Sequence, residues 1–353
     1  MKILISALSG IGDALMFSPA LKLLRQNFPE AQVDILSMFK GVEELYSENS
    51  DIDSVIHWDF LKSNPISSLL FLFKLRRIKY DITINVYPSN RWPYNLISFL
   101  IGAKQRLGHD YNHLNFQSLN FLNNYRIRED DLMHNVEENV RLLELINVKL
   151  KGEIPPLQIT LKEDDKESAK EWLRMNGIAA EKKIVGFHAG SALMKNHAKR
   201  RWAPEKFAEL GKTLIEKHNA AILLFGGPDE YELNERVNQM MEQKAVVVKV
   251  PTMMRTVALM NECSIFVVND SGLMHIAASL GLPIVTIFAY TNPHYVYPWK
   301  TKYKLIRKDL ECSPCFYYSP RPASCKWKED KFRCITQIGV VEVLSSVEKL
   351  LEE

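Results

Sequence analysis

The sequence predicts an α/β protein made of two successive doubly wound units, each a parallel sheet with crossover helices. Three observations predict this class. Apolar, strand-like segments alternate with amphipathic helical segments along most of the chain. The alternation is interrupted by the linker-like segment 151–156 (KGEIPP) and then restarts. Polar, glycine-containing turns fall where strands give way to helices, which is where an open α/β sheet gathers its ligand-binding residues.

The composition is that of a folded, water-soluble chain. Its 353 residues correspond to about two domains, and 46% hydrophobic with 25% charged residues excludes a wholly disordered or collagen-like protein. The net charge of +3 is too balanced to indicate a polyanion, so nucleic acid is not an expected partner. The uncharged run 271–293 contains His275 and the helix-breaking Gly281-Leu282-Pro283, so no membrane-spanning helix is predicted.

The first half of the chain opens as strand, helix, strand. Four strands are predicted, over residues 2–8, 32–37, 54–57 and 81–86. Helices are predicted over 14–27, which ends at Phe28-Pro29, and over 137–146. The opening apolar run stops at Gly10 and has no small-residue cleavage site, so we expect a strand rather than a secretion signal, and a cytoplasmic protein. These elements form a predicted N-terminal domain, residues 1–155.

The second half, residues 156–353, repeats the same alternation. Strands are predicted over 183–188, 221–225, 246–250, 264–268 and 283–288. Helices are predicted over 163–176, 204–218, 229–243, 254–262 and 273–280. From residue 310 the chain becomes rich in Cys and Pro, and we expect a loop over 310–335 followed by a closing amphipathic helix over 340–351.

The first strand-to-helix turn, Ser9-Gly10-Ile11-Gly12-Asp13, carries a carboxylate. It lacks the third glycine of the dinucleotide fingerprint, since Leu15 stands there, which disfavours a nicotinamide cofactor. Asp13 at the end of a strand can take a proton from an attacking hydroxyl, and the glycines let a ligand approach the backbone. The alternative is that Asp13 only caps the following helix.

Three further turns have the chemistry of an anion site. In Asn269-Asp270-Ser271-Gly272-Leu273-Met274-His275, backbone N–H groups at a helix start can bind phosphate, or the same residues merely cap the helix and bury His275. The turn 188–191 (HAGS) precedes Lys199-Arg200-Arg201-Trp202, whose cations can neutralise a departing pyrophosphate or simply face solvent. The turn 225–230 (FGGPDE) can shape a nucleoside pocket or be an ordinary turn. Together the four turns favour a nucleotide-linked anion.

At these residues the chain resembles glycosyltransferase family 9, the bacterial heptosyltransferases of lipopolysaccharide core assembly. The segment 12–20 is similar to the family's Gly-Asp-x-x-x-x-x-Pro-Ala element, and His188-Ala189-Gly190-Ser191 to its His-Pro-Gly-Ala element. The most specific match runs from Asp270 to Ala277 and on to Thr291-Asn292-Pro293. In one departure, Arg200 with Lys199 beside it stands where the family often has Lys, so which cation contacts phosphate stays open.

The resemblance implies a GT-B type fold, with the acceptor on the N-terminal domain and the nucleotide sugar on the C-terminal domain. It implies an inverting transfer of heptose from ADP-heptose to a lipid-linked core sugar, with no metal required for catalysis and with Asp13 as general base. The donor-binding residues that we expect are Ser191, Lys199, Arg200, Gly227, Glu230, Asp270, Ser271, Gly272 and His275. The acceptor-binding candidates are Gly12, Arg91, Arg106 and His109.

Four of the five cysteines form a candidate structural metal site. Cys312 and Cys315 make a CxxC pair, followed by Cys325 and Cys334, and four thiolates suit Zn²⁺ or iron. They are too few and too local for a disulfide-stapled fold. Some family 9 members carry a similar cluster, and related autotransporter heptosyltransferases hold iron there. The alternative is a set of reduced, packed thiols.

A lipid-linked acceptor would bring the enzyme to the inner, cytoplasmic membrane surface as a peripheral protein. Residues 69–79 are apolar and then basic, and 92–101 are apolar with a tryptophan, so both segments are candidates for that contact. The interpretation that we favour is that both are helices buried in the N-terminal domain. Two other functions stay open: a transferase of the same fold that uses another nucleotide sugar, and a non-catalytic scaffold assembled through the Cys loop.

Overall fold

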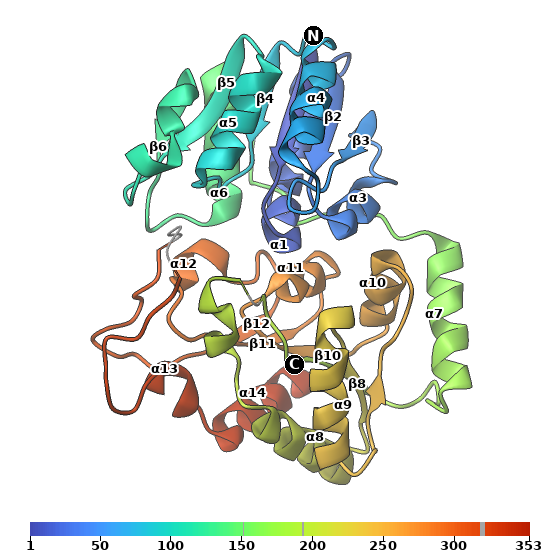
Figure 1. Ribbon diagram of the computed structural model, residues 1–353. Coiled ribbons are helices and arrows are strands. Elements are labelled where there is room, and N and C mark those ends of the chain that lie inside the picture. Colours follow the sequence, from blue (N-terminus) through green and yellow to red (C-terminus); the bar gives the residue numbers. More distant parts are fainter. Residues whose placement is uncertain (151, 193, 318–321) are drawn as a thin grey trace. The chain divides into compact units, whose positions relative to one another are not determined.

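The structure is a computed structural model that describes residues 1–150, 152–192, 194–317 and 322–353. The chain divides into two compact units, one made of Met1–Thr160 and the other beginning at Leu161. Each unit has one six-stranded sheet with helices packed around it (Figure 1). The predicted fold class, two doubly wound α/β units, is confirmed.

The sheet of the first unit is parallel throughout, in the order β3-β2-β1-β4-β5-β6. Its strands are β1 (Lys2–Ala7), β2 (Gln32–Ser37), β3 (Ser54–His57), β4 (Ile82–Asn85), β5 (Gln105–Asp110) and β6 (Tyr125–Arg128). The strand order reverses direction between β1 and β4, which lie side by side. Chains leaving these two neighbours turn to opposite faces, and this is the place where open α/β sheets bind ligands.

The helices of the first unit are α1 (Ile11–Leu15), α2 (Ser18–Asn27), α3 (Lys40–Tyr46), α4 (Pro65–Arg76), α5 (Trp92–Ile101) and α6 (Asn135–Leu142), with short 3₁₀ turns at Phe116–Ser118, Asn120–Leu122 and Leu143–Ile146. The single helix predicted over 14–27 is in fact two helices, α1 and α2. Pro19 explains the position of the break, because proline has no N–H to donate and fits only in a helix's first turn.

The second unit repeats this plan, with a parallel sheet in the order β12-β11-β10-β7-β8-β9. Its strands are β7 (Ile184–His188), β8 (Ala221–Leu224), β9 (Val246–Val247), β10 (Ile265–Asn269), β11 (Ile284–Ile287) and β12 (Tyr303–Ile306). Its helices are α7 (Glu163–Met175), α8 (Pro204–His218), α9 (Tyr231–Met240), α10 (Met253–Asn261), α11 (Gly272–Ser279), α12 (Pro293–Val296), α13 (Arg333–Thr336) and α14 (Val340–Glu352), with 3₁₀ turns at Met194–Arg200 and Pro228–Glu230. The order reverses between β7 and β10.

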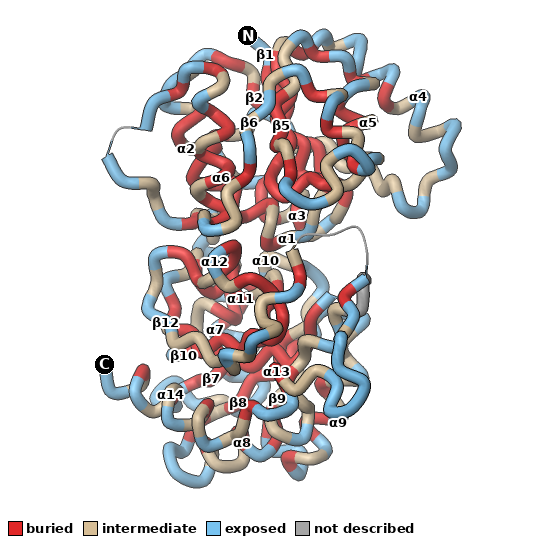
Figure 2. The backbone as a smooth tube through the Cα atoms, turned by 90° about the vertical axis from the view of Figure 1, so that its left-hand side faces the viewer, coloured by how far each residue is buried: buried red, intermediate tan, exposed pale blue. Residues whose placement is uncertain are grey.

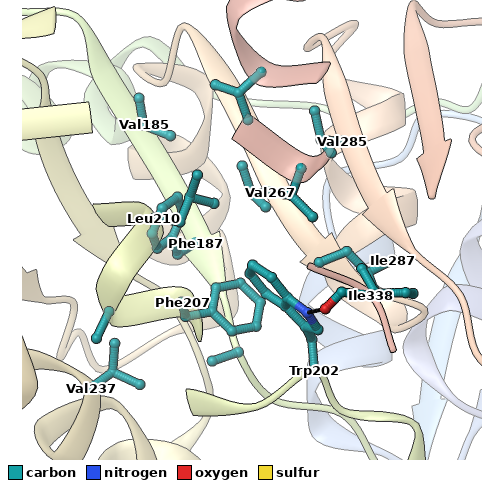
Figure 3. Packing of buried hydrophobic residues seen from close by; sticks show 14 of the residues in the cluster. Val185, Phe187, Trp202, Phe207, Leu210, Val237, Val267, Val285, Ile287 and Ile338 are labelled. Atoms are coloured by element: carbon teal, nitrogen blue, oxygen red, sulfur yellow. Dashed lines mark hydrogen bonds between the residues drawn. The ribbon is translucent and has the colours of Figure 1, made fainter. Parts of the chain in front are cut away.

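Trp202 lies in the centre of the second unit's core. Its ring is fully buried and meets Phe207 edge-on, with ring centroids 5.0 Å apart (Figure 3). The indole N–H donates to the carbonyl of Ile338 at 3.0 Å, so this buried polar group is satisfied. The residue directly after the basic segment 199–201 is thereby fixed to the chain just before α14.

The sequence did not indicate β5, β6 and β12, because their residues are polar or mixed: QRLGHD, YRIR and YKLI. β6 and β12 are edge strands, where one side of the strand needs no apolar partner.

The expectation that segments 69–79 and 92–101 are both buried helices is wrong for the first. Half of the residues of α5 are buried, but α4 exposes several large apolar side chains. Figure 2 colours most of α4 as exposed or intermediate. Among the described residues, no helix is both long and apolar enough to cross a membrane.

Candidate active site

The strand-order reversal of the first unit places Asp13 beside the loop that follows β4. Asp13 lies in α1, directly after β1, and its carboxylate accepts the Gly10 backbone N–H at 3.2 Å. The Ser9 hydroxyl donates to the Pro88 carbonyl at 2.7 Å and so joins the β1 loop to the β4 loop. Asp13 therefore takes part in capping α1, but as the third residue of the helix and not as its N-cap residue, which is Gly10. Because Asp13 is only half-buried, its carboxylate can also meet a ligand.

Arg91 brings a cation to the same end of the sheet. It is the residue before α5, and its guanidinium carbon lies 5.8 Å from the centre of the Tyr94 ring. Burial raises the pKa of Tyr94, the charge of Arg91 lowers it, and the charge of Asp13 raises it. Arg91 and Asp13 therefore act on the same phenol, which places both beside the start of α5.

The other two acceptor candidates lie differently. Arg106 is near the beginning of β5, at the opposite end of the strand from the turns, and donates to the carbonyls of Leu122 and Ala103 at 3.0 and 2.8 Å. The structure does not bring it to Asp13. His109, near the end of β5, is buried, with its Nε2 atom 3.3 Å from a Glu138 carboxylate oxygen.

A buried polar network surrounds His109 at this end of the sheet. The Tyr87 hydroxyl donates to Glu129 at 2.8 Å, and the Tyr87 ring packs on His109 with centroids 4.6 Å apart. Burial raises the pKa of Glu129, while hydrogen bonds from Asn112 and Tyr87 lower it. No short motif could have predicted this network, because its members are scattered over some forty residues and meet only through β4, β5 and β6.

His188 links two turns at the strand-order reversal of the second unit. At the end of β7, its Nδ1 lies 2.8 Å from the Ser271 hydroxyl and its Nε2 lies 2.9 Å from Glu230. Burial alone would raise the pKa of Glu230, but His188, Arg201 and the Gly227 N–H together lower it. Three turns that are far apart in the sequence therefore form one hydrogen-bonded site.

Gly190 leaves room for the Glu230 carboxylate at this site. A Cβ atom on Gly190 would come within 1.8 Å of a Glu230 carboxylate oxygen, so a larger residue would displace that side chain. Asn269 holds the same turn from the other side, because its amide donates to the carbonyls of Ala189 and Gly190 at 2.9 and 3.2 Å.

The three cations at 199–201 have different environments. Arg200 is largely buried and forms an ion pair with Asp270 at 2.8 Å, and Asp270 also accepts the Thr291 hydroxyl at 2.6 Å. Arg201 donates to the Ser191 hydroxyl and carbonyl and to Glu230. Lys199 is exposed. The basic run is therefore a solvated surface only at its first residue.

The N-terminus of α11 is open to an anion. Ser271 is the N-cap residue, yet its hydroxyl contacts His188 and makes no capping bond to the helix. Gly272, which follows, adds no side chain at the helix start. Free N–H groups with the positive end of the helix dipole attract phosphate.

Two buried polar atoms near this helix start have no hydrogen-bond partner among the described residues: Arg200 Nε and His275 Nδ1. Burial, together with the nearby Arg200 charge, lowers the pKa of His275 to about 3, so the imidazole is neutral at physiological pH. Buried polar atoms in folded proteins are nearly always paired, so unpaired ones beside an uncapped helix are typical of a ligand site.

The four clustered cysteines surround one cavity of about 260 Å³, which Tyr290 also lines. All are reduced, and burial raises the pKa of Cys334 to about 11, with the other three thiols adding to the effect. Within the described part of the chain, no group of three or more His, Cys, Asp or Glu side chains has an arrangement that would hold a metal ion. Part of the predicted loop 310–335, residues 318–321, lies outside the described residues.

Comparison with known proteins identifies relatives over the whole chain. The model of glycosyltransferase family 9 (heptosyltransferase) matches residues 71–323. Lipooligosaccharide heptosyltransferase 2 of Campylobacter jejuni is 25% identical over 361 aligned positions, which cover 100% of this chain and 99% of that protein. This alignment includes the Asp13 turn, which lies before the family match.

Two solved structures share the fold over nearly their full lengths. A family 9 glycosyl transferase from Veillonella parvula has a TM-score of 0.78 at 22% identity, covering 99% of this chain and 97% of its own. The ADP-heptose lipopolysaccharide heptosyltransferase II of Escherichia coli has a TM-score of 0.75 at 20% identity, covering 100% and 99%.

Proposed function

Because the chain belongs to glycosyltransferase family 9, we propose that it transfers heptose from ADP-heptose to a sugar of the lipopolysaccharide core. The relatives' names support both the sugar and the acceptor. In this proposal the second unit binds the nucleotide sugar and the first unit binds the lipid-linked acceptor at the inner membrane surface.

The observation that carries the proposal is the pair of unpartnered buried atoms, Arg200 Nε and His275 Nδ1, beside the uncapped start of α11. A diphosphate fits this chemistry, because its oxygens can accept from Arg200 and from the free helix N–H groups. His275, held neutral, can donate or accept one hydrogen bond without adding charge. Lys199 is exposed and would contribute little, so Arg200 is the cation that we assign to the phosphate.

We assign the binding of the donor's nucleoside to the turn 227–230. Glu230 is held by His188, Arg201 and the Gly227 N–H, and its pKa is lowered, so it is a fixed carboxylate that can accept from hydroxyl groups of a ribose. Arg201 in turn holds Ser191 next to this carboxylate.

The transfer step needs a base and a stabilised leaving group. Asp13 takes the proton of the acceptor hydroxyl as that oxygen attacks the anomeric carbon of the heptose. The new carbon–oxygen bond forms as the bond from the anomeric carbon to the phosphate oxygen breaks, with inversion at that carbon. The negative charge that develops on the departing ADP is stabilised by Arg200 and the N-terminus of α11, both fixed before the reaction.

Nucleotide selectivity tests the proposal. Thermal unfolding is measured with ADP, UDP, GDP, CMP and NAD at equal concentrations, and a ligand at a hundred times its Kd stabilises by about 2.7 kcal/mol. We expect stabilisation by ADP, followed by transfer from ADP-heptose to a core acceptor with an inverted anomeric product by NMR. Stabilisation by UDP or GDP alone would mean another donor sugar, and none by any nucleotide would favour a non-catalytic scaffold.

We also propose that the four clustered thiols hold a structural Zn²⁺ or iron ion. Two observations support a metal ion: the four thiols line one cavity, and four thiolates suit both metals. The described side chains are not arranged around a common centre. The backbone N–H groups of Cys315 and Phe316 donate to Tyr290, and the Tyr290 ring is within electrostatic reach of Arg200 and Asp270. An ion there would fix the loop beside the donor site.

Elemental analysis of the purified chain tests this second proposal. We expect about one metal ion per chain, lost in Cys312→Ser/Cys315→Ser and kept in Cys263→Ser, whose thiol is buried elsewhere. Metal-free protein of unchanged thermal stability would show that these are packed thiols.

A further inference from the structure

The outer face of α4 carries a stripe of exposed apolar side chains. Ile66, Leu69, Leu70 and Phe73 follow the i, i+3, i+4, i+7 spacing that lines one side of a helix, and Ile66 and Leu70 are 74% and 64% exposed. Figure 2 draws most of this helix in the exposed and intermediate colours. A surface helix of an isolated soluble protein normally presents polar residues on this side.

The inner face of α4 is fully used in packing. Leu72 and Leu75 are buried in the first unit's core, and Phe71 stacks on Trp58 with ring centroids 4.4 Å apart. Arg76 donates to the Leu100 carbonyl at 3.1 Å and so ties the end of α4 to α5. Because the core already occupies the inner face, rotation of the helix cannot hide the outer stripe.

The charges around the stripe have one sign. Residues 60–80 contain five cations and no carboxylate: Lys62, Lys74, Arg76, Arg77 and Lys79. Lys74 and Arg77 follow Leu70 and Phe73 by four residues each, so they continue the exposed face. Asp59, just before this segment, lies 3.8 Å from Lys62.

We propose that the outer face of α4 docks on an anionic lipid bilayer. At 12 residues the helix is roughly 18 Å long, too short to span the hydrocarbon core and long enough to lie in the interface. Its apolar side chains enter the headgroup boundary while the flanking cations meet anionic headgroups. The inference deepens the proposed function, because it names the surface by which the first unit reaches a lipid-linked acceptor.

Vesicle co-sedimentation of the full chain tests this surface without any sugar substrate. We expect binding to vesicles of 30% phosphatidylglycerol in phosphatidylethanolamine, little binding to phosphatidylcholine, and release at high salt. Leu70→Ser/Phe73→Ser should weaken binding at least tenfold. Met175→Ser/Val341→Ser is the control, because it removes two apolar side chains of the second unit that are even more exposed than Leu70 and Phe73 and should leave binding unchanged.

Charge reversal measures the electrostatic contribution to vesicle binding separately from the contribution of the apolar side chains. Lys74→Glu/Arg77→Glu removes two cations, each worth about fivefold in binding to an anionic surface, so a loss of at least 25-fold is expected. Lys170→Glu/Lys182→Glu, at exposed positions of the second unit, should change binding much less. Unchanged circular dichroism and thermal unfolding would show that each variant is folded.

Besides a lack of vesicle binding, two results would overturn the proposal. One is vesicle binding that the α4 variants do not weaken. The other is a protein that forms dimers without lipid, measured by light scattering, and becomes monomeric in Leu70→Ser/Phe73→Ser, which would make a second copy of the chain the occupant. A lack of vesicle binding with intact ADP binding would contradict only the proposed docking surface. Vesicle binding without nucleotide binding would contradict only the transferase proposal.

Discussion

The two strand-order reversals of this protein hold their charged groups in contrasting ways. In the first unit, Asp13 is half-buried on a short helix, and Arg91 lies nearby above an aromatic ring. In the second unit, Arg200, Arg201, Asp270 and Glu230 are fixed in buried ion pairs, with Ser271 held by His188.

This difference matches two chemical tasks. A general base must reach the hydroxyl of each incoming acceptor and take its proton, so its carboxylate must be accessible to the acceptor. Groups that stabilise a departing diphosphate act best when they are oriented before the reaction, because no reorganisation is then needed in the transition state. This contrast supports our proposal that the fixed network binds the donor and that the more open carboxylate serves the acceptor.

The largest expected effect is on turnover, from the open carboxylate. Asp13→Asn should lower kcat by about 10²- to 10⁴-fold, because the amide cannot accept the acceptor's proton. The Kd for ADP should not change. Steady-state transfer and calorimetric titration measure the two quantities. Glu30→Gln, an exposed carboxylate of the same unit, is the control, and an unaltered kcat in Asp13→Asn would remove Asp13 as the base.

The second effect concerns the pH dependence of stability. His275 has its pKa lowered to about 3 by burial and by Arg200, from an ordinary value of 6.5. Its contribution to stability is thus complete above pH 6.5 and is lost as the pH falls toward 3, because the unfolded chain binds the proton first. The loss is about 1.4 kcal/mol per pH unit, or roughly 3 kcal/mol by pH 4.

Denaturant unfolding of His275→Gln between pH 7 and 4 measures this loss. The variant should lack this part of the acid destabilisation, whereas His294→Gln, at an exposed histidine, should follow the parent protein. Equal pH slopes in all three proteins would mean that His275 is not held neutral in the folded state.

The third effect distinguishes the contributions of two neighbouring cations to phosphate binding. Arg200→Met should raise the Kd for ADP about 10- to 100-fold, the value of a charge-assisted hydrogen bond, while Lys199→Met should change it less than about threefold. Inorganic pyrophosphate should show the same contrast. The reverse ranking would assign the phosphate contact to Lys199. Because Arg200→Met also leaves Asp270 unpaired, Arg200→Met/Asp270→Asn should recover thermal stability without recovering affinity.

The smallest effect is expected at the nucleoside turn. Glu230→Gln should raise the Kd for ADP about tenfold, because a neutral amide replaces a charged acceptor, and should affect pyrophosphate less. Asp229→Asn, one residue earlier in the same turn, is the matched control. An equal loss for ADP and pyrophosphate would mean that Glu230 acts only by holding Arg201 and His188.

The fold class and the family could be predicted from the sequence because both are indicated by patterns of residues that are contiguous in the chain. Alternating apolar strands and amphipathic helices are visible within windows of ten residues, and the turns at 12–13, 188–191 and 270–275 are contiguous motifs. The break between α1 and α2 was missed, although Pro19 marks it.

The pairings inside the site could not be predicted, because they join residues far apart in the sequence. Arg200 pairs with Asp270 across 70 residues, and His188 meets Ser271 across 83. The sequence contains three adjacent cations, and nothing in it indicates which of them are buried and which is exposed. Only the packing of β7 against β10 and β8 shows that Arg200 and Arg201 form ion pairs that are largely buried, while Lys199 faces solvent.

The hydrogen bond from Trp202 to Ile338 has a consequence for how the chain is made. Trp202 gains this hydrogen bond only when residue 338 is in place, so the core behind the basic segment 199–201 is completed near the end of synthesis. All six strands of the first sheet lie within residues 1–128, and that sheet can assemble on the ribosome long before. A nascent chain stalled before residue 338 should therefore carry a folded first unit and a second unit whose core is incomplete.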